Sequence, residues 1–292
     1  MARGERVGAV IAGAGSGSRL GAQLPKALVP IAGEPLVVHA IRSMNRSGIT
    51  RIVVTIPQDA DSQQLFAEAL AAADVHAELV PGGLTRQESV ARGLAHIDTP
   101  YVLIHDAARP FVPPAVVDRV VAALDAGYEA VVPALPVADT IKEIREAHAL
   151  PIPEREEPSD QICEGDSAPV ADALLPADKK KLLAPIAGGV STEVEPVGRT
   201  LERQRLRAMQ TPQGFRRDIL EHAHRLERER SMDEAIAAPD DAALVEMAGG
   251  HVVLVAGAPE AMKVTTPWDL RIARMIAEEY AGGSPEGKTH VS

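Results

Sequence analysis

The chain has 292 residues, a formal net charge of −11 and a single cysteine, Cys163. The acidic balance argues against nucleic-acid binding, and the lone cysteine excludes an internal disulfide and a cysteine-based zinc site. No apolar run reaches membrane-spanning length and the first residues lack a secretory apolar stretch, so we expect no membrane partner and a cytoplasmic protein.

Short apolar runs rich in valine and isoleucine alternate with longer segments of helical periodicity. A series of this kind predicts an α/β, Rossmann-like fold, in which helices flank a mostly parallel twisted sheet. Ligands of such sheets bind beyond the carboxyl ends of the strands. The predicted strands are 6–12, 51–56, 76–80, 101–105 and 129–133, and the predicted helices are 35–44, 61–72, 86–95, 114–126, 215–228, 240–248 and 267–280.

A glycine-rich segment follows the first predicted strand and ends with two cations. Gly13, Gly15 and Gly17 permit positive φ and let backbone N–H groups approach phosphate oxygens. Arg19 and Lys26, seven positions apart, supply charge that amides alone do not. The pattern indicates a cradle for a nucleoside triphosphate or a similar polyanion. The alternative is a strand-to-helix loop with incidental cations.

Spacing separates this loop from two other phosphate-binding loops. The Gly-Lys-Ser/Thr sequence of a Walker A motif is absent. A dinucleotide fingerprint needs G-x-G-x-x-G, but Ser18 and Leu20 occupy the positions where its last glycine would stand. What remains resembles the glycine-rich loop of sugar-nucleotide nucleotidyltransferases.

Further motifs make this resemblance closer. The chain resembles the 2-C-methyl-D-erythritol 4-phosphate cytidylyltransferase family of the non-mevalonate isoprenoid pathway, over about residues 6–147 and 198–280. That resemblance implies a nucleotidyltransferase fold with a projecting dimerisation arm, and a homodimer. The motifs that follow the glycine loop, in family order, are His105-Asp-Ala-Ala-Arg-Pro110, Ala138-Asp-Thr-Ile-Lys142, Thr211-Pro-Gln-Gly-Phe215, Asp240-Asp241 and Met262-Lys-Val-Thr265.

The resemblance assigns the phosphate-binding residues. Arg19 and Lys26 would contact the triphosphate of CTP, and Lys263 would lie near its α-phosphate and the incoming phosphate. These three are the predicted catalytic residues, although Lys263 also reads as a solvated strand-end lysine. The backbone expected to hold the triphosphate belongs to Ala12, Gly13, Ala14, Gly15 and Gly17.

The segment 81–89 resembles the part of the family that reads the base. Gly82, Gly83 and Ser89 would meet the donor and acceptor edge of cytosine. Leu84 stands where many relatives have an acidic residue, which weakens the side-chain contribution. Thr85 and Glu88 also form a capping-box pattern for the helix that begins there, which does not exclude binding.

Asp106 is expected to bind the nucleotide through Mg²⁺ or another divalent cation. Mg²⁺ prefers oxygen ligands and keeps several waters, so one carboxylate plus phosphates is a sensible site. The alternative is that Asp106 caps the following turn. Asp240 resembles an acid near the metal or triphosphate, yet it also reads as a helix start. His105 reads as a packing residue.

The polyol phosphate acceptor would be held by Arg109, Thr140, Arg203 and Thr211, some of them across a dimer interface. Arg109 could instead pair with Asp106. Arg203 is one of a basic cluster, so which arginine contacts the acceptor stays open. The other members of the cluster are Arg199, Arg205 and Arg207.

The segment 148–197 breaks the alternation. It carries seven of the 23 prolines, an acidic run and a basic run, with no sustained periodicity. We interpret it as an insertion within the arm region, either a disordered excursion or an extension that contacts a partner. Residues 1–147 and 198–281 would then form one domain, and 282–292 a flexible tail.

The expected function is transfer of a cytidylyl group from CTP to 2-C-methyl-D-erythritol 4-phosphate by in-line attack on the α-phosphate. One alternative is another polyol phosphate acceptor, such as ribitol 5-phosphate. The other is an inactive nucleotide-binding protein on the same fold. Retention of Arg19, Lys26, Asp106 and Lys263 together argues against an inactive site.

Overall fold

The computed structural model describes residues 3–15, 24–144, 197–228 and 237–281. They belong to two units, one formed by Met1–Pro136 with Arg207–Ser292 and the other by Val137–Leu206. The predicted insertion, apart from Val197, and the predicted tail lie outside the described residues.

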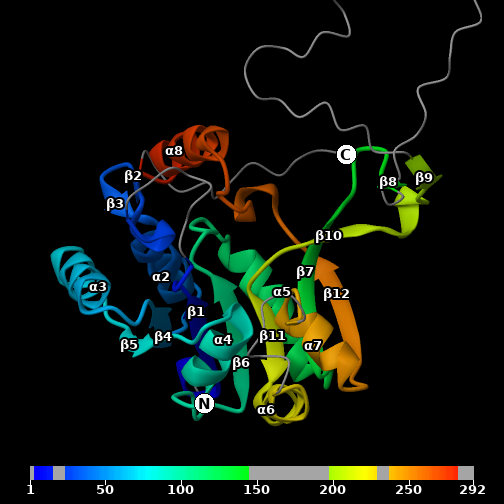
Figure 1. Cartoon of the computed structure of the whole chain (residues 1–292), viewed down its shortest axis with the longest axis horizontal. Helices are drawn as coiled ribbons and strands as arrows, with labels where there is room; N and C mark the ends of the chain where they lie inside the picture. Colours follow the sequence, from blue (N-terminus) through cyan, green and yellow to red (C-terminus); the bar gives the residue numbers. More distant parts are fainter. Residues whose placement is uncertain (1–2, 16–23, 145–196, 229–236, 282–292) are drawn as a thin grey trace, which may run out of the picture. The chain divides into compact units, whose positions relative to one another are not determined.

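The first unit is built on a mostly parallel sheet, as the sequence predicts (Figure 1). The strand order is β10-β7-β11-β6-β1-β4-β5, and β12 also pairs with β7. Only β10 and β11 run antiparallel to their described neighbours. The strands are β1 (Val7–Ala12), β4 (Arg51–Ile56), β5 (Glu78–Pro81), β6 (Tyr101–Asp106), β7 (Ala130–Pro136), β10 (Arg207–Met209), β11 (Gln213–Arg216) and β12 (Val252–Ala256).

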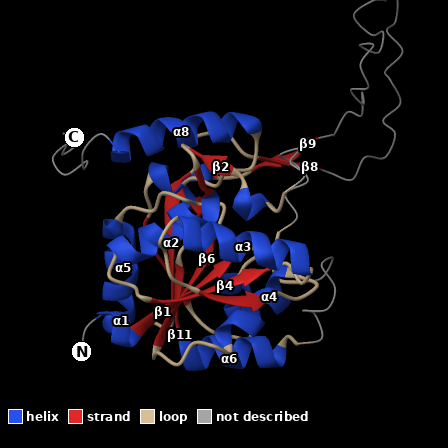
Figure 2. Ribbon diagram, turned by 90° about the vertical axis from the view of Figure 1, so that its left-hand side faces the viewer, coloured by secondary structure: helices blue, strands red, loops and turns tan. Residues whose placement is uncertain are grey.

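Helices cover both faces of this sheet because its strands are apolar on both sides. In β1, Ile11 packs into one core and Val10 into the other, as alternation along a strand requires. The first core includes side chains of α2 (Leu36–Arg46), α3 (Ala60–Ala72) and α5 (Pro114–Asp125), and the second those of α4 (Arg86–Leu94), α6 (Arg217–Leu226) and α7 (Asp241–Met247). Figure 2 shows strands of the sheet between α5 and α4.

A smaller third core joins the C-terminal helix α8 (Pro267–Ala281) to the N-terminal half of the first unit. Ala273 and Ala277 of α8 pack with Ile31 and Phe111, and the ring of Phe111 stacks on that of Tyr280 at 5.7 Å. Val264 belongs to the same core, so this packing anchors the segment that precedes α8. Short elements complete the unit: α1 (Arg3–Arg6), η2 (Lys26–Leu28), β2 (Pro30–Ile31), β3 (Glu34–Pro35) and η6 (Pro259–Ala261).

The second unit contains a two-stranded antiparallel ribbon of β8 (Lys142–Ile144) and β9 (Val197–Thr200). The ribbon is followed by the short helix η4 (Arg203–Arg205). An ion pair between Arg199 and Glu143 joins the two strands.

The predicted secondary structure lacks the short strands β2, β3, β8, β9 and β10, and two further parts of it are wrong. Residues 213–216 form β11, and α6 begins only at Arg217, whereas the prediction began that helix at Phe215. Phe215 is fully buried in the sheet, and an apolar residue within a four-residue strand has the same pattern as the first residue of an amphipathic helix. The prediction also missed β12, although Val252–Ala256 is a short apolar run of the expected kind.

No helix in the described part of the chain is both long enough and apolar enough to cross a membrane.

Candidate active site

Asp106 lies at the carboxyl ends of the parallel strands and pairs with two cations there, Lys263 and Arg86. It is the last residue of β6, in register with Ala12 at the end of β1. Its Oδ2 lies 2.8 Å from Lys263 Nζ, and its Oδ1 lies 3.4 Å from Arg86 Nη2. Burial opposes ionisation, but the two cations hold the pKa of the Asp106 carboxyl far below its ordinary value. The carboxylate is therefore ionised at neutral pH.

Lys263 reaches this carboxylate because the segment before α8 is tied to the residues that follow β6. Val264 N–H donates to Ala108 O at 2.8 Å. Arg109 Nη1 donates to Ala261 O at 2.7 Å. The Lys263 ammonium contacts Asp106, and the side chain as a whole remains 42% exposed.

Arg86 joins Asp106 to a second buried acid. It is the first residue of α4, and its Nη1 lies 2.7 Å from Asp241 Oδ2 in the first turn of α7. The Asp241 side chain is 1% exposed. From the sequence, Arg86 belongs to the segment 81–89 that resembles the base-reading region and equally to the first turn of a helix, and Asp240 rather than Asp241 was selected, so this pair was not predicted.

His105 is held neutral behind Asp106. It is fully buried, and burial lowers its pKa to about 4. Its Nε2 lies 3.0 Å from Arg109 O, and its Nδ1 lies 2.8 Å from Thr211 Oγ1, which also accepts from Asp106 N–H at 3.1 Å. The network assigns the proton to Nε2, with Thr211 donating to Nδ1. His105 is therefore a neutral packing residue at neutral pH, as predicted, and the Thr211 hydroxyl is engaged within the fold.

The glycine loop after β1 is described in part. Gly13 N–H donates to Thr55 O at 2.9 Å, and a Cβ on Gly13 would lie 2.9 Å from the same oxygen, so this position requires glycine. Gly15 is exposed, and its carbonyl accepts from Lys26 N–H at 3.3 Å, which brings the start of η2 back to the loop. Gly17 and Arg19 lie outside the described residues.

The Gly82–Gly83 loop after β5 is fixed by Ser89. The Ser89 hydroxyl accepts from Gly83 N–H at 2.9 Å and donates to Thr85 O at 2.8 Å. A Cβ on Gly82 would lie 2.7 Å from Ser89 Oγ and 3.0 Å from the Cβ of Ala14. Two glycine-containing loops, after β1 and after β5, are therefore in contact.

The N-cap of the predicted capping box is present, and the Glu88 carboxylate turns back to the residue before that N-cap. Thr85 accepts from Glu88 N–H at 3.0 Å as the N-cap of α4, and Glu88 accepts from Leu84 N–H at 2.7 Å. Leu84 is 75% exposed and contributes no charge to this loop.

The remaining predicted residues are placed as follows. Asp240 is the N-cap of α7, and its two oxygens accept from Ala243 N–H at 2.8 Å and Gln213 Nε2 at 2.9 Å. Arg109 donates to backbone oxygens and not to Asp106, since its Nη2 donates to Met209 O at 3.2 Å. Thr140 and Arg203 are exposed residues of the second unit, where Arg203 Nη1 donates to Ala138 O at 2.6 Å.

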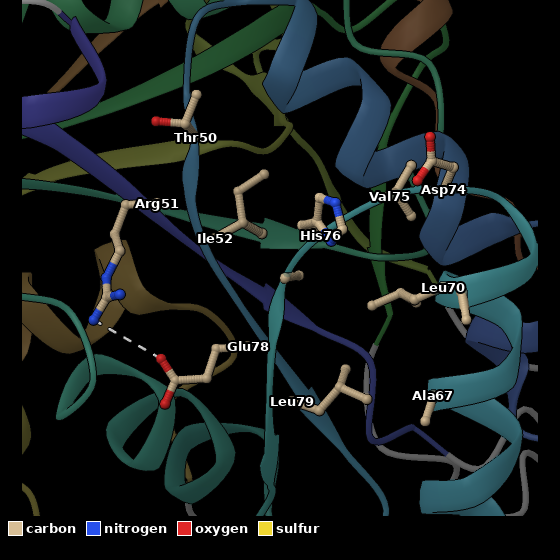
Figure 3. A pocket seen from close by; sticks show the side chains of 12 residues that line it. Thr50, Arg51, Ile52, Ala67, Leu70, Asp74, Val75, His76, Glu78 and Leu79 are labelled. Atoms are coloured by element: carbon tan, nitrogen blue, oxygen red, sulfur yellow. Dashed lines mark ion pairs between the residues drawn. The ribbon is translucent and has the colours of Figure 1, made fainter.

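A cavity of about 630 Å³ lies elsewhere in the first unit (Figure 3). It is lined by the start of β4, including Arg51, and by Leu70 and Glu78. Because Arg51 and Glu78 begin their strands, the cavity is at the amino ends of the parallel strands, opposite Asp106. It takes no part in the site around Asp106.

The sequence matches a protein-family model described as 2-C-methyl-D-erythritol 4-phosphate cytidylyltransferase, over residues 7–158 and 186–279. A curated protein of that name from Streptomyces avermitilis is 40% identical over 283 residues, covering 94% of this chain and 92% of the relative. Another from Saccharopolyspora erythraea is 39% identical and covers 92% of this chain and 97% of the relative.

Solved structures agree with the sequence relatives. The crystal structure of a 2-C-methyl-D-erythritol 4-phosphate cytidylyltransferase from Thermus thermophilus is 28% identical, with a TM-score of 0.63, covering 94% of this chain and 99% of that one. A 4-diphosphocytidyl-2C-methyl-D-erythritol synthase from Anaerococcus prevotii, 21% identical with a TM-score of 0.66, covers 94% of this chain and 97% of that one and shares the fold. The chain therefore belongs to the 2-C-methyl-D-erythritol 4-phosphate cytidylyltransferase family.

Proposed function

We propose that this protein transfers the cytidylyl group of CTP to 2-C-methyl-D-erythritol 4-phosphate, giving 4-diphosphocytidyl-2-C-methyl-D-erythritol and pyrophosphate. Membership of the family supports the reaction. The observation that carries it in the structure is the Lys263–Asp106 ion pair at the carboxyl ends of β1 and β6, beside the glycine loop. Another polyol phosphate as the preferred acceptor is not favoured by these relatives.

In the reaction, a phosphate oxygen of the acceptor attacks the α-phosphorus of CTP. The new bond joins that oxygen to the α-phosphorus, while the bond to the oxygen bridging the α- and β-phosphates breaks and pyrophosphate leaves. The attacking phosphate monoester is already ionised at neutral pH, so no protein base is required. This agrees with a His105 whose pKa is about 4 and whose ring is enclosed by hydrogen bonds.

The task of the protein is to position the phosphates and neutralise charge that develops in the transition state. Lys263 supplies a positive charge that is oriented before substrate arrives, because Asp106 holds its ammonium. Lys26 lies at the end of the glycine loop, and we propose that it and Arg19 compensate the charge of the triphosphate. Gly82, Gly83 and Ser89 would present the cytosine pocket.

Asp106 fits the divalent cation expected for this chemistry. Mg²⁺ bound mainly by substrate phosphates and waters needs only one or two carboxylates, and Asp106 is ionised at the edge where the phosphates would bind. Among the described residues, no group of three or more His, Cys, Asp or Glu side chains could form an all-protein metal site. When bound, the ion would neutralise phosphate charge. Asp240 is occupied as the N-cap of α7, whereas Asp106 ends β6 at the carboxyl edge of the sheet, so we assign the ligand to Asp106.

The acceptor residues and the homodimer belong to the same proposal. Arg109, Thr140, Arg203 and Thr211 match family positions for the polyol phosphate, and part of the set would come from the arm of a second subunit. The proposed compartment is the cytoplasm. The molar mass of the protein in solution, measured by light scattering, tests the dimer: twice the chain mass is expected, and a monomer that retains full activity would contradict it.

A substrate panel tests the function itself. Purified protein is incubated with CTP, Mg²⁺ and one acceptor at a time, and pyrophosphate release is measured. We expect 2-C-methyl-D-erythritol 4-phosphate to give the highest kcat/KM, with ribitol 5-phosphate far below it. Higher efficiency with ribitol 5-phosphate would reassign the acceptor, and absence of turnover with every acceptor would contradict the proposal.

A further inference from the structure

We propose that Arg86 and Asp241 are positioning residues for the proposed reaction. In this arrangement Asp241 anchors Arg86, and Arg86 fixes the orientation of the Asp106 carboxylate that in turn holds Lys263. The effect that we expect on kinetics rests on the proposed function. The effect that we expect on the Lys263–Asp106 ion pair rests on the geometry of the first unit alone.

The four side chains form a line of alternating charge. Arg86 contacts one carboxylate with each terminal nitrogen, Asp241 through Nη1 at 2.7 Å and Asp106 through Nη2 at 3.4 Å. Asp106 then meets Lys263 through its other oxygen at 2.8 Å. Each oxygen of Asp106 thus has its own cation, and this fixes the rotation of the carboxylate about its Cβ–Cγ bond.

Burial gives this line its rigidity. The side chains of Asp241, Asp106 and Arg86 are 1%, 12% and 26% exposed. A buried ion pair offsets the lost hydration of its two charges only when its geometry is good. The planar guanidinium of Arg86 presents two nitrogens at a fixed separation, whereas a lysine in its place would offer one ammonium as a point charge.

Asp241 is held in place by its surroundings. Its second oxygen, Oδ1, lies 3.5 Å from Nε2 of the buried His224 on α6. The start of α7 is fixed to β11 by Gln213, whose side chain donates to Asp240 Oδ2 at 2.9 Å and accepts from Ala242 N–H at 3.1 Å. Because β11 pairs directly with β6, Asp241 and Asp106 are held by neighbouring strands.

Within the described ranges, the Arg86 and Asp241 side chains form an ion pair with each other, and Arg86 forms a second one with Asp106, so Asp106 links them to Lys263. We therefore expect their loss to lower kcat more than it raises KM for CTP. A role limited to folding would instead reduce activity only as far as it reduces the folded fraction.

The test compares Arg86→Met, Asp241→Leu, and the double variant carrying both. Each single change leaves a buried charge without its partner, so each should lower the melting temperature. The double variant removes both charges and should regain most of that loss. Arg217→Met is the matched control, because Arg217 also begins a helix, donates to Ile97 O at 2.8 Å and pairs with Glu221 at 3.6 Å, near the amino end of β6.

We expect kcat of the double variant to stay about 10–100-fold below wild type, the effect of losing one charge-assisted hydrogen bond, with KM for CTP changed by less than about threefold. Arg217→Met should keep the wild-type kcat. Recovery of kcat in the double variant along with stability would overturn the inference, because the pair would then serve folding only.

A crystal structure of the double variant gives a readout that needs no activity. We expect the distance from Asp106 Oδ2 to Lys263 Nζ to exceed about 4 Å, the limit of an ion pair. An unchanged Lys263–Asp106 distance would overturn the inference even if the wild-type protein transferred nothing. If the wild type fails in the substrate panel while the variant shows a broken Lys263–Asp106 ion pair, only the proposed function is overturned.

Discussion

Lys263 Nζ lies 2.8 Å from Asp106 Oδ2, although one residue precedes the C-terminal helix and the other ends a strand in the middle of the sheet. The ion pair exists because the segment before α8 is joined to the segment after β6, through Val264 N–H to Ala108 O and Arg109 to Ala261 O. The ammonium of Lys263, near the C-terminal helix, thereby contacts the carboxylate of Asp106 at the carboxyl ends of the parallel strands.

Lys263→Ala should lower kcat by about 10²–10³-fold without unfolding the protein. The change removes about 3–4 kcal/mol of transition-state stabilisation, while a side chain that is 42% exposed contributes little to the core. Steady-state kinetics and a thermal melt check both parts. Lys263→Arg, which keeps the charge, should recover part of the rate. Wild-type turnover in Lys263→Ala would remove this residue from the mechanism.

Lys26→Ala and Arg19→Ala should each lower turnover by a similar factor while leaving the protein folded. Each change removes a positive charge expected at the triphosphate, and such contacts are worth most in a site from which water is excluded. Turnover is measured with CTP and Mg²⁺ at saturating acceptor. If either variant turns over at the wild-type rate, the glycine loop is not a triphosphate cradle.

Ser89→Ala should raise KM for CTP by about tenfold. Without the hydroxyl, Gly83 N–H and Thr85 O lose their shared partner, so the Gly82–Gly83 loop loses its fixed shape. Ser47→Ala is the matched control, because Ser47 is also buried and donates to a backbone carbonyl, that of Ser43 at 3.0 Å. The control should lose similar stability and keep its KM. Equal KM values in the two variants would separate the loop from CTP binding.

Stability should fall as the pH falls from about 6.5 to about 4, in part because of His105. Its folded-state pKa of about 4 is below the ordinary value, so the unfolded chain takes up a proton first and is favoured by acid. For a fully buried ring this amounts to about 3 kcal/mol. His39, whose pKa burial also lowers, acts in the same direction.

Urea unfolding of wild type and His105→Gln at about pH 7 and about pH 5 isolates that contribution. The destabilisation caused by the substitution should be smaller at the lower pH. His251→Gln, at an exposed position, is the control and should destabilise the protein little at either pH. An equal destabilisation by His105→Gln at both pH values would show that His105 is not held neutral.

The parallel sheet and its helices could be predicted because apolar alternation and helical periodicity are local signals. Asp106 and Lys263 could be selected from motifs. Arg86 and Asp241 could not, because a charged residue in the first turn of a helix has the same pattern whether it faces water or a buried partner. One signal was available: with Asp240 as the N-cap, the adjacent acid must point elsewhere.

The most direct test of cytidylyl transfer measures both products of one reaction. Purified protein, CTP, 2-C-methyl-D-erythritol 4-phosphate and Mg²⁺ are combined, pyrophosphate is quantified, and the nucleotide product is identified by mass spectrometry. We predict one pyrophosphate for each 4-diphosphocytidyl-2-C-methyl-D-erythritol formed, and loss of both products in Lys263→Ala. Pyrophosphate without the conjugate, or an equal yield of conjugate from Lys263→Ala, would contradict cytidylyl transfer at the Asp106–Lys263 site.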